Sequence, residues 1–361
     1  MISHTISVPL GAGGYPIYLG VDLLQRLGAQ CKLHNVPRRV VILADRNSAR
    51  AALHRAVRSL ESEGFEVSPV IIPPGERQKS LTRAEAIVSS LLKMRIPRRA
   101  AVIALGGGVI GDLAGFVASI YRRGVDFIQC PTTLLAQADS SVGGKNGVNH
   151  PLRKNAIGTF KQPVFVLSDV SVLSSLPRRE VISGLGEILK YPIVQDPAIL
   201  SYVEEHLDAV LQCSKDHLID ISSRCLRIKS SLVAEDEHEL LSDRGRVFLN
   251  VGHAVGHALE SLSQYRLRHG EAVLLGILAE GHIAVQKVGF PADERDRFVT
   301  IYRRLGCRYD IRAIRNSAIQ KRIFGKERVH FVLPRKLGEV SVVDDVTSDQ
   351  LLEGLEFLRS L

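Results

Sequence analysis

The sequence predicts an α/β protein in which a Rossmann-like N-terminal domain with a mainly parallel sheet precedes a mainly α-helical C-terminal domain. Short β-branched runs alternate with helical patterns in the first half of the chain, as in repeated βαβ units. Beyond Ser174-Ser175-Leu176-Pro177 these strand-like runs nearly vanish and long helical patterns dominate. A chain of 361 residues is long enough for two domains that each bury a core. We therefore expect a boundary near Pro177 and domains of residues 1–177 and 178–361.

Five strands are predicted in the first domain, and a helical segment follows each of the first three. The strand runs are Val40–Ala44, Val67–Pro73, Ala100–Leu105, Phe127–Cys130 and Val164–Asp169. The helical segments are Ser48–Gly64, Ser80–Met94 and Gly111–Tyr121. In the second domain the helical patterns are interrupted by a predicted β-hairpin from Val329 to Val343.

Composition and charge narrow the classes of function. The formal net charge is +9, and arginine doublets are spread along the chain with acidic residues between them. This spreading suits an anionic metabolite better than a nucleic-acid track, which needs a concentrated basic face and, for single strands, aromatic residues. Aromatic residues are scarce and Trp is absent, so we expect no nucleic-acid partner. The doublets are Arg38-Arg39, Arg98-Arg99, Arg122-Arg123, Arg178-Arg179 and Arg303-Arg304.

Cysteine usage and hydropathy favour a cytoplasmic protein without a membrane role. Five cysteines are an odd number without CxxC spacing, so they indicate neither a disulfide framework nor a thiolate zinc site. The N-terminus MISHTISVPLG lacks the basic and apolar regions of a signal peptide. The one membrane-like stretch, Ala100–Tyr121, is broken by three glycines and by Asp112, so it predicts a strand, a turn and a helix. The cysteines are Cys31, Cys130, Cys213, Cys225 and Cys307.

A glycine motif lies between a predicted strand and a predicted helix. Gly106–Gly111 satisfies GxGxxG, which in this context places a pyrophosphate at a helix N-terminus, although a solvated glycine turn gives the same pattern. The acidic residue that binds the ribose is expected about twenty positions after the glycine motif, at the end of a strand. Asp126 lies at about that distance but begins a strand, whereas Asp45 ends one and is the better candidate. Because parallel strands end at the same edge of a sheet, we expect the groups that follow strands to converge there. They are Asp45, Gly75-Glu76, Gly106-Gly107-Gly108 and Thr132-Thr133.

The loop-like stretch Asp139–Asn155 is typical of a binding site. Its glycines allow the backbone to adopt positive φ and to approach a ligand closely, and its lysines supply charges suited to phosphate or carboxylate. A solvated glycine turn is the plain alternative, but the stretch follows a predicted strand and a second glycine motif. A Walker phosphate loop is excluded, because Asp139 and Asn146 stand where that motif needs Gly and Ser or Thr.

Metal-ligand candidates lie in the helical half. His253 and His257 are four residues apart on one helical face, and His269 follows beside Gly270-Glu271. The spacing suits zinc, but Ala254 replaces the glutamate of HExxH, so a protease is not predicted. A further ligand from another helix is needed, and Glu187 is a candidate because neighbouring glycines allow close approach.

Seven motifs occur in one order between about Asp45 and Glu271, and together they resemble the 3-dehydroquinate synthase family. They are PGERQKS, LGGGVIGDLAGF, YRRGVDFIQCPTTLLAQADSSVGGKNGVNHP, KNAIGTF, PRREVISGLGEILKY, LNVGHAVGHALE and HGEAV. The resemblance implies a cytoplasmic homodimeric lyase of the shikimate pathway that depends on NAD and zinc, for which cobalt can substitute. Its substrate would be a small phosphorylated sugar acid, 3-deoxy-D-arabino-heptulosonate 7-phosphate, which is converted to 3-dehydroquinate and phosphate.

The resemblance also implies roles for individual residues. The metal ligands would be Glu187, His253 and His269, which leaves His257 as a substrate contact. The NAD-binding residues would be Asp45, Gly75, Glu76, Lys79, Gly107, Gly108, Val109, Asp112, Thr132, Thr133, Lys145 and Lys154. The substrate and catalytic residues would be Asp139, Lys145, Asn155, Lys190, Lys229, Arg246, Asn250 and His257, with Arg123 supplied by the neighbouring subunit. The first domain would thus bind NAD, and the second would bind metal and substrate.

The chain departs from the family pattern at two relevant places. The segment between Lys229 and Arg246 is longer than usual, and the usual Asp-Lys-Lys near the C-terminus is absent. The corresponding phosphate contact is therefore unassigned among Lys321, Arg322 and Lys326. Three rival functions remain: a metal-dependent alcohol dehydrogenase, which would release NADH, a sister cyclase whose substrate lacks a carboxylate, and a non-enzymatic zinc- or nucleic-acid-binding module.

Overall fold

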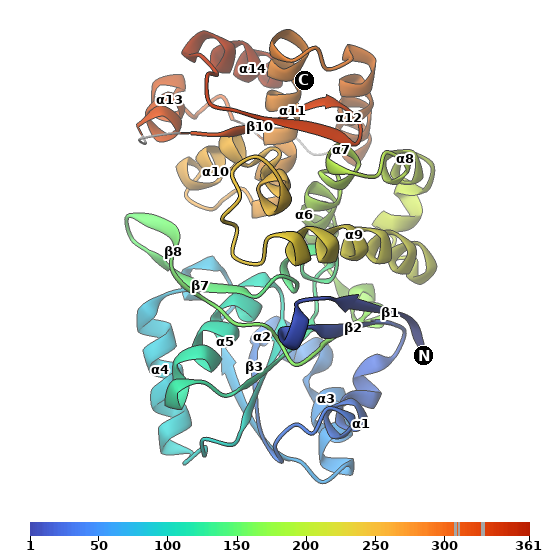
Figure 1. The fold of residues 1–361 in the computed structure, drawn as a ribbon, viewed down its shortest axis with the longest axis vertical. Helices are drawn as coiled ribbons and strands as arrows, with labels where there is room; N and C mark the ends of the chain where they lie inside the picture. The colour runs from blue at the N-terminus through green and yellow to red at the C-terminus, as the bar shows by residue number, and fades with distance from the viewer. Residues whose placement is uncertain (307–308, 310, 326–328) are drawn as a thin grey trace. The chain divides into compact units, whose positions relative to one another are not determined.

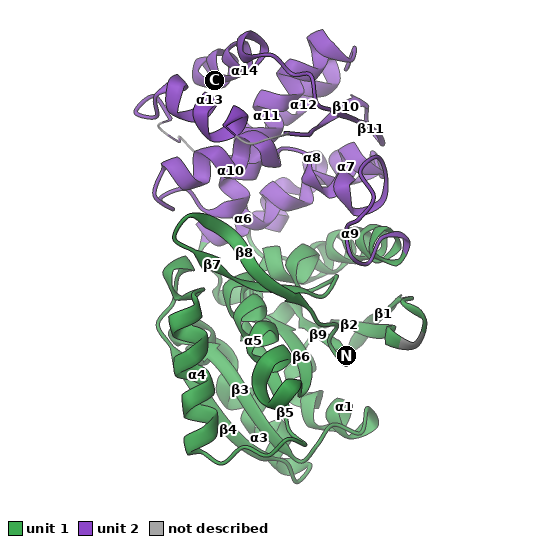
Figure 2. Ribbon diagram, turned by 60° about the vertical axis from the view of Figure 1, so that its left-hand side comes forward, with its two compact units in different colours: residues 1–177, 212–234 green, residues 178–211, 235–361 purple. Residues whose placement is uncertain are grey.

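The computed structural model describes every residue of the chain except 307–308, 310 and 326–328. Cys307 and Lys326 therefore lie outside the described residues. The chain divides into two compact units, which Figure 2 shows in different colours. The first unit comprises Met1–Pro177 and Gln212–Ala234, and the second comprises Arg178–Leu211 and Glu235–Leu361. The chain leaves the first unit after Pro177 and contributes one later segment to it.

A seven-stranded sheet forms the centre of the first unit (Figure 1). Its strand order is β1-β2-β9-β6-β5-β3-β4, and the pairs are parallel except for β1 and β2. The interior strand β5 is buried along its whole length, as expected for an apolar strand with both faces covered. The strands are β1 (Ile2–Val8), β2 (Tyr15–Gly20), β3 (Arg39–Asp45), β4 (Glu66–Ile72), β5 (Ala101–Gly106), β6 (Asp126–Pro131) and β9 (Val166–Asp169).

Helices between the strands complete the first unit. On one face of the sheet, Val41, Leu43 and Val102 pack in one apolar cluster with residues of α4 and α5. Two further helical segments contain π-type turns, at Ala49–Leu53 and Ala136–Ser140. The α-helices are α1 (Leu27–Leu33), α2 (Arg46–Ser48), α3 (His54–Ser62), α4 (Leu81–Lys93), α5 (Gly108–Ile120) and α9 (Lys215–Glu235).

The predicted loop at Asp139–Asn155 is in large part a β-hairpin. Strands β7 (Lys145–His150) and β8 (Arg153–Phe160) pair antiparallel outside the main sheet. Gly147 and Gly158 face each other there, and a Cβ on either would lie 2.7 Å from a carbonyl oxygen of the other strand. The glycines thus allow two strands to pair closely. The sequence alone does not distinguish this role from that of glycines in a flexible turn.

The N-terminal strands β1 and β2 were not predicted. β2 pairs with β9, so Ile17 lies beside Val166 although nearly 150 residues separate them in the sequence. Local sequence patterns do not encode a pairing at this separation.

The described residues of the second unit are mainly helical and include an antiparallel hairpin of β10 (Phe331–Lys336) and β11 (Glu339–Val343) (Figure 2). This pair lies within the predicted hairpin Val329–Val343, and the predicted fold class is confirmed. Among the described residues, no helix combines the length and the apolar character needed to cross a membrane. The helices are α6 (Arg178–Ile188), α7 (Tyr191–Val194), α8 (Ala198–Leu211), α10 (His253–Leu262), α11 (His269–Lys287), α12 (Ala292–Leu305), α13 (Asn316–Phe324) and α14 (Ser348–Ser360).

Candidate functional site

The carboxyl ends of four parallel strands meet at one edge of the sheet in the first unit. The register pairs Asp45 of β3 with Ile72 of β4 and Gly106 of β5 with Pro131 of β6. The groups that follow these strands therefore converge, as their positions in the sequence predicted. Thr132 donates its backbone N–H to the carbonyl of Gly106 at 3.0 Å, which ties the end of β6 to the glycine motif.

The glycine motif leads into helix α5. Gly107 caps the helix and Gly108 is its first residue, so the unpaired N–H groups of the first turn point toward this edge. A Cβ on Gly107 would lie 2.9 Å from Cγ2 of Thr133, so a larger residue would displace the threonine. An N-terminus of this kind binds anions through its N–H groups and its dipole.

A buried lysine ties three segments of this edge together. Lys79, with 4% of its surface exposed, forms an ion pair with Asp112 of α5 and donates to Oδ1 of Asn155 at 2.6 Å. Asn155 has a φ of +53° just after the start of β8. The network joins the turn after β4, helix α5 and the β7–β8 hairpin around one positive charge.

A second network involves Glu76 and an asparagine that the sequence reasoning missed. Oε1 of Glu76 accepts a hydrogen bond from Asn149 at 2.8 Å and lies 3.8 Å from Nζ of Lys154. Oδ1 of Asn149 in turn accepts from the backbone N–H of Asn155 at 3.0 Å. Asn149 lies inside the stretch that the sequence singled out, but its amide was not distinguished from the others there.

Asp45 is oriented by its own helix. Its Oδ1 accepts hydrogen bonds from the backbone N–H groups of Asn47 at 2.7 Å and Ser48 at 2.9 Å, so it acts as the N-cap of α2. This holds the carboxylate at the end of β3. Gly75 has a φ of +109° in the turn before Glu76, a conformation that favours glycine.

A buried ion pair joins the Asp139 stretch to helix α9. Nζ of Lys229 lies 2.8 Å from Oδ1 of Asp139 and also donates to the carbonyl of Asp139 at 2.7 Å. Both residues are more than 90% buried. Lys145 begins β7 and is exposed. Arg123 is exposed with a φ of +68° and precedes β6, so it lies at the sheet edge opposite to Thr132.

In the second unit, three histidines form a cluster at the start of two helices. His253 is the first residue of α10, His257 follows one turn later, and His269 is the first residue of α11. One ring nitrogen from each lies within 4.8 Å of the others. Such spacing is compatible with ligands of a single metal ion.

Glu187, near the end of α6, also faces this cluster. Its Oε1 lies 2.9 Å from Nε2 of His269 and 3.7 Å from Nε2 of His253, and its Oε2 lies 2.7 Å from Nζ of Lys190. A Cβ on Gly186 would lie 1.9 Å from the carbonyl oxygen of Gly270, so only glycine allows α6 and α11 to approach this closely. The close approach brings the carboxylate to the histidines.

The electrostatic environment prepares these side chains for metal binding. Burial opposes ionisation of Glu187, but Lys190, His253 and His269 outweigh it and hold the pKa of this carboxyl well below its usual range. Burial, together with Lys190 and His269, lowers the pKa of His253 to about 4, although Glu187 acts in the opposite direction. At neutral pH the cluster therefore offers a carboxylate and a neutral imidazole, the forms that bind metals.

Hydrogen bonds to the outer nitrogens orient two of the imidazoles. Nδ1 of His269 lies 3.1 Å from Oε2 of the buried Glu260, and Nδ1 of His253 lies 2.9 Å from the carbonyl oxygen of Val251. Each Nε2 is thereby directed toward Glu187. This arrangement matches the outer partners that hold metal-binding histidines in other proteins. The sequence reasoning missed Glu260.

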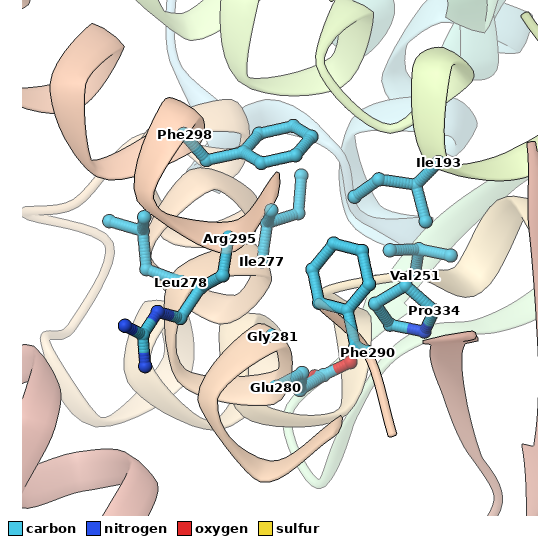
Figure 3. Close-up of a pocket in the computed structure, with 10 residues that line it drawn as sticks. All are labelled: Ile193, Val251, Ile277, Leu278, Glu280, Gly281, Phe290, Arg295, Phe298 and Pro334. Carbon is cyan, nitrogen blue, oxygen red and sulfur yellow. The ribbon is translucent and has the colours of Figure 1, made fainter. Parts of the chain in front are cut away.

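Another buried carboxylate, Glu280 of α11, supports the start of α10. It accepts hydrogen bonds from the backbone N–H groups of Gly252 and Val255, both at 2.9 Å, and also from that of Ala254. It borders an apolar cavity of about 10 Å³, which is too small for a substrate (Figure 3). Its sequence signal, one carboxylate within an otherwise apolar helical stretch, was overlooked.

The remaining predicted residues of the second unit lie around helical turn Gly245–Asn250. Arg246 is 4% exposed and donates to the carbonyl of Glu237 at 2.7 Å, and Asn250 donates to Glu239 at 3.2 Å. Lys321 and Arg322 lie in α13 and are exposed.

Comparison with known proteins assigns the chain to a family. The model of the 3-dehydroquinate synthase N-terminal domain matches residues 69–183, and that of the 3-dehydroquinate synthase C-terminal domain matches residues 184–328. The chain is 39% identical to a 3-dehydroquinate synthase of Desulforamulus reducens, covering 96% of this chain and 98% of the relative. It is 41% identical to one of Pseudomonas fluorescens, covering 96% and 95%.

Solved structures share the fold at lower identity. A 2-epi-5-epi-valiolone synthase of Streptomyces hygroscopicus, solved with NAD⁺ and Zn²⁺, has a TM-score of 0.87 and 24% identity over 96% of this chain and 97% of its own. An iron-containing alcohol dehydrogenase of Thermotoga maritima has a TM-score of 0.71 and 13% identity over 96% and 98%. At these identities the likeness concerns the fold.

Proposed function

We propose, because the chain belongs to the 3-dehydroquinate synthase family, that it converts 3-deoxy-D-arabino-heptulosonate 7-phosphate to 3-dehydroquinate and phosphate. The observation that carries the proposal is similarity at about 40% identity over nearly the whole chain and nearly the whole of its relatives. The protein is then a phosphate-eliminating lyase that uses NAD and a divalent metal.

The metal would be held by Glu187, His253 and His269. One carboxylate and two imidazoles are a common catalytic zinc set that leaves coordination positions for substrate. The three histidines alone would form an alternative set, but Glu187 faces the Nε2 atoms of both His253 and His269. A bound divalent ion supplies Lewis acidity, which lowers the pKa of a coordinated alcohol. His257, the exposed member of this cluster, is left to contact substrate.

NAD would bind at the strand-end edge of the first unit. The N-terminus of α5, with Gly107, Gly108 and Val109, would receive the pyrophosphate, and Asp45 would bind a ribose hydroxyl. NAD held by these residues would supply reversible hydride transfer. Further contacts would come from Gly75, Glu76, Lys79, Asp112, Thr132, Thr133, Lys145 and Lys154.

Basic and amide side chains would bind the two anionic groups of the substrate. Arginine suits a planar carboxylate because its two parallel N–H donors match the two oxygens, and lysines suit phosphate as point charges. Lys229 is positioned by Asp139, and Lys190 by Glu187. The proposed substrate-binding residues are Asp139, Lys145, Asn155, Lys190, Lys229, Arg246, Asn250 and His257. The usual C-terminal contact would fall to Lys321 or Arg322, or to Lys326 outside the described residues.

We also propose a cytoplasmic homodimer in which Arg123 contacts the substrate phosphate of the partner. Arg123 precedes β6 and Thr132 follows it, so the arginine lies at the sheet edge opposite to the proposed NAD site of its own chain. This placement supports a role for the arginine in a neighbouring subunit.

The test is to incubate the purified protein with NAD, zinc and 3-deoxy-D-arabino-heptulosonate 7-phosphate. We expect phosphate and 3-dehydroquinate in equal amounts, with no net NADH at its absorbance band, because oxidation and reduction balance within one turnover. Stoichiometric NADH would instead indicate a dehydrogenase. Turnover only of a sugar phosphate without a carboxylate would indicate a sister cyclase.

A further inference from the structure

A groove rich in arginine lies at the sheet edge opposite to the proposed NAD site. It forms where β3, β4 and β5 begin, has a volume of about 640 Å³, and is lined by nine residues of the first unit. The volume falls within the range of small-ligand sites. The lining residues are Asn35, Val36, Pro37, Arg38, Arg39, Glu66, Arg95, Pro97 and Arg99.

The groove is built by a repeated helix-to-strand connection. The sequences NVPRRV, from Asn35, and RIPRRA, from Arg95, share the pattern x-[Val/Ile]-Pro-Arg-Arg. Their first residues have φ of +52° and +53° and follow helices α1 and α4. Both helices end with the same hydrogen bond. The backbone N–H of Val36 donates to the carbonyl of Cys31, and that of Ile96 donates to the carbonyl of Leu91, in each case five positions earlier in the chain.

The repeat places two arginine pairs side by side. The register of the parallel strands pairs Val40 with Ala101, so the pair Arg38-Arg39 adjoins the pair Arg98-Arg99. At the start of β4, Phe65-Glu66 takes the place of such a pair, since Glu66 is in register with Arg39, and Arg38 donates to the carbonyl of Gly64 at 2.9 Å.

Little within the protein neutralises this charge. Arg39 lies 3.4 Å from the exposed carboxylate of Glu66. Within the described part of the chain, the side chains of Arg95, Arg98 and Arg99 have no ion pair or hydrogen bond, and all three are exposed. Four arginines thus line the groove with one carboxylate, although like charges repel one another.

We propose that this groove binds a small anion with a chain of phosphate groups, of the nucleoside triphosphate or inorganic polyphosphate class. Guanidinium groups bind phosphate oxygens through pairs of parallel hydrogen bonds, and several of them along a groove match several phosphates. A single-stranded nucleic acid fits less well, because none of the lining residues is aromatic and bases would have nothing to stack on. The inference is independent of the proposed catalytic function.

The test uses a fluorescent ATP analogue and the full-length protein with Mg²⁺ and saturating NAD, so that adenine nucleotides do not enter the NAD site. We expect anisotropy to rise on binding and unlabelled ATP and tripolyphosphate to displace the probe. Equal displacement would assign recognition to the phosphate chain, and much stronger displacement by ATP would add the nucleoside to it. Both results support the proposal.

Variants connect the binding to the groove. Arg95→Ala with Arg99→Ala should weaken binding by about tenfold or more, since each change removes a charge-assisted contact to the anion but no side-chain hydrogen bond or ion pair among the described residues. Glu66→Gln should strengthen binding, because it removes the lining carboxylate. Arg58→Ala, which removes one arginine charge on helix α3 outside the groove lining, should leave the affinity unchanged.

Three results would overturn the proposal. They are no binding at millimolar ATP and tripolyphosphate, binding that the double variant leaves unchanged, and tighter binding of a single-stranded oligonucleotide that the double variant abolishes. In all variants turnover of the proposed substrate should persist, because none of the substituted residues is among those assigned to NAD, metal or substrate. The assay therefore fails or succeeds separately from the proposed enzymatic function.

Discussion

Removal of the carboxylate behind His269 should weaken metal binding without direct loss of a ligand. Glu260 is 3% exposed, and its Oε2 lies 3.1 Å from Nδ1 of His269, whose Nε2 faces Glu187. In Glu260→Ala the imidazole loses the partner that orients its ring and increases its basicity. Loss of such outer partners typically reduces metal affinity by about 10- to 100-fold, which corresponds to roughly 1.4 to 2.7 kcal/mol.

The conservative variant should give an intermediate result. Glu260→Gln keeps an oxygen that can accept from Nδ1 but removes the negative charge, and charge-assisted hydrogen bonds are roughly twice as strong as neutral ones. About half of the free-energy loss should therefore remain, or roughly a three- to tenfold weaker affinity.

The assay is competition for zinc between the metal-free protein and a chromophoric chelator at pH 7. Glu204→Ala is a suitable control, because it removes a two-contact ion pair with Arg297 elsewhere in the second unit. It should leave zinc affinity unchanged, whatever its effect on thermal stability. A folded Glu260→Ala protein whose zinc affinity is within twofold of that of the wild type would refute the reasoning. If the alanine variant does not fold, Glu260→Gln provides the same test.

Three further predictions concern other parts of the molecule. His269→Ala should lose both zinc and turnover, whereas His257→Ala should retain zinc and lose rate; full activity of metal-free His269→Ala protein would contradict the assignment. Burial raises the pKa of Glu280 to about 8, against backbone hydrogen bonds that lower it. Between these two values the Glu280 carboxyl is protonated in the folded state, whereas in the unfolded state it has lost its proton near the ordinary pKa of 4.5. The free energy of unfolding, relative to Glu280→Gln, should therefore fall by at most about 1.4 kcal/mol per pH unit from pH 5 to 8 in urea titrations, and a flat difference would contradict this. Finally, Arg123→Ala and Lys190→Ala should each be inactive alone but recover part of the activity in mixed dimers, since one site then has both wild-type residues; no recovery would place the arginine contact within one chain.

The local sequence was sufficient to predict the fold class and the strand-end edge. Alternating β-branched and helical runs predict parallel strands, and because parallel strands share a direction, the positions of Asp45, Gly107 and Thr132 after their strands imply that they meet. The His253 and His257 pair was likewise visible, because residues four apart share one face of a helix. These inferences need only periodicity and chain direction.

Only the tertiary structure decided which distant groups complete the clusters. Glu187 reaches the histidines because Gly186 and Gly270 allow two helices to touch, and neither glycine by itself specifies the other as its neighbour. Glu260 and Glu280 became identifiable only when their hydrogen-bond partners were placed. The sequence by itself therefore determined the parallel strands, the helical half and the chemistry of the site residues, because these depend on local backbone preferences and spacing, but not β1, β2 or the β7–β8 hairpin. The tertiary structure decided the partnerships, because close packing between segments far apart in the chain depends on the shapes of both surfaces.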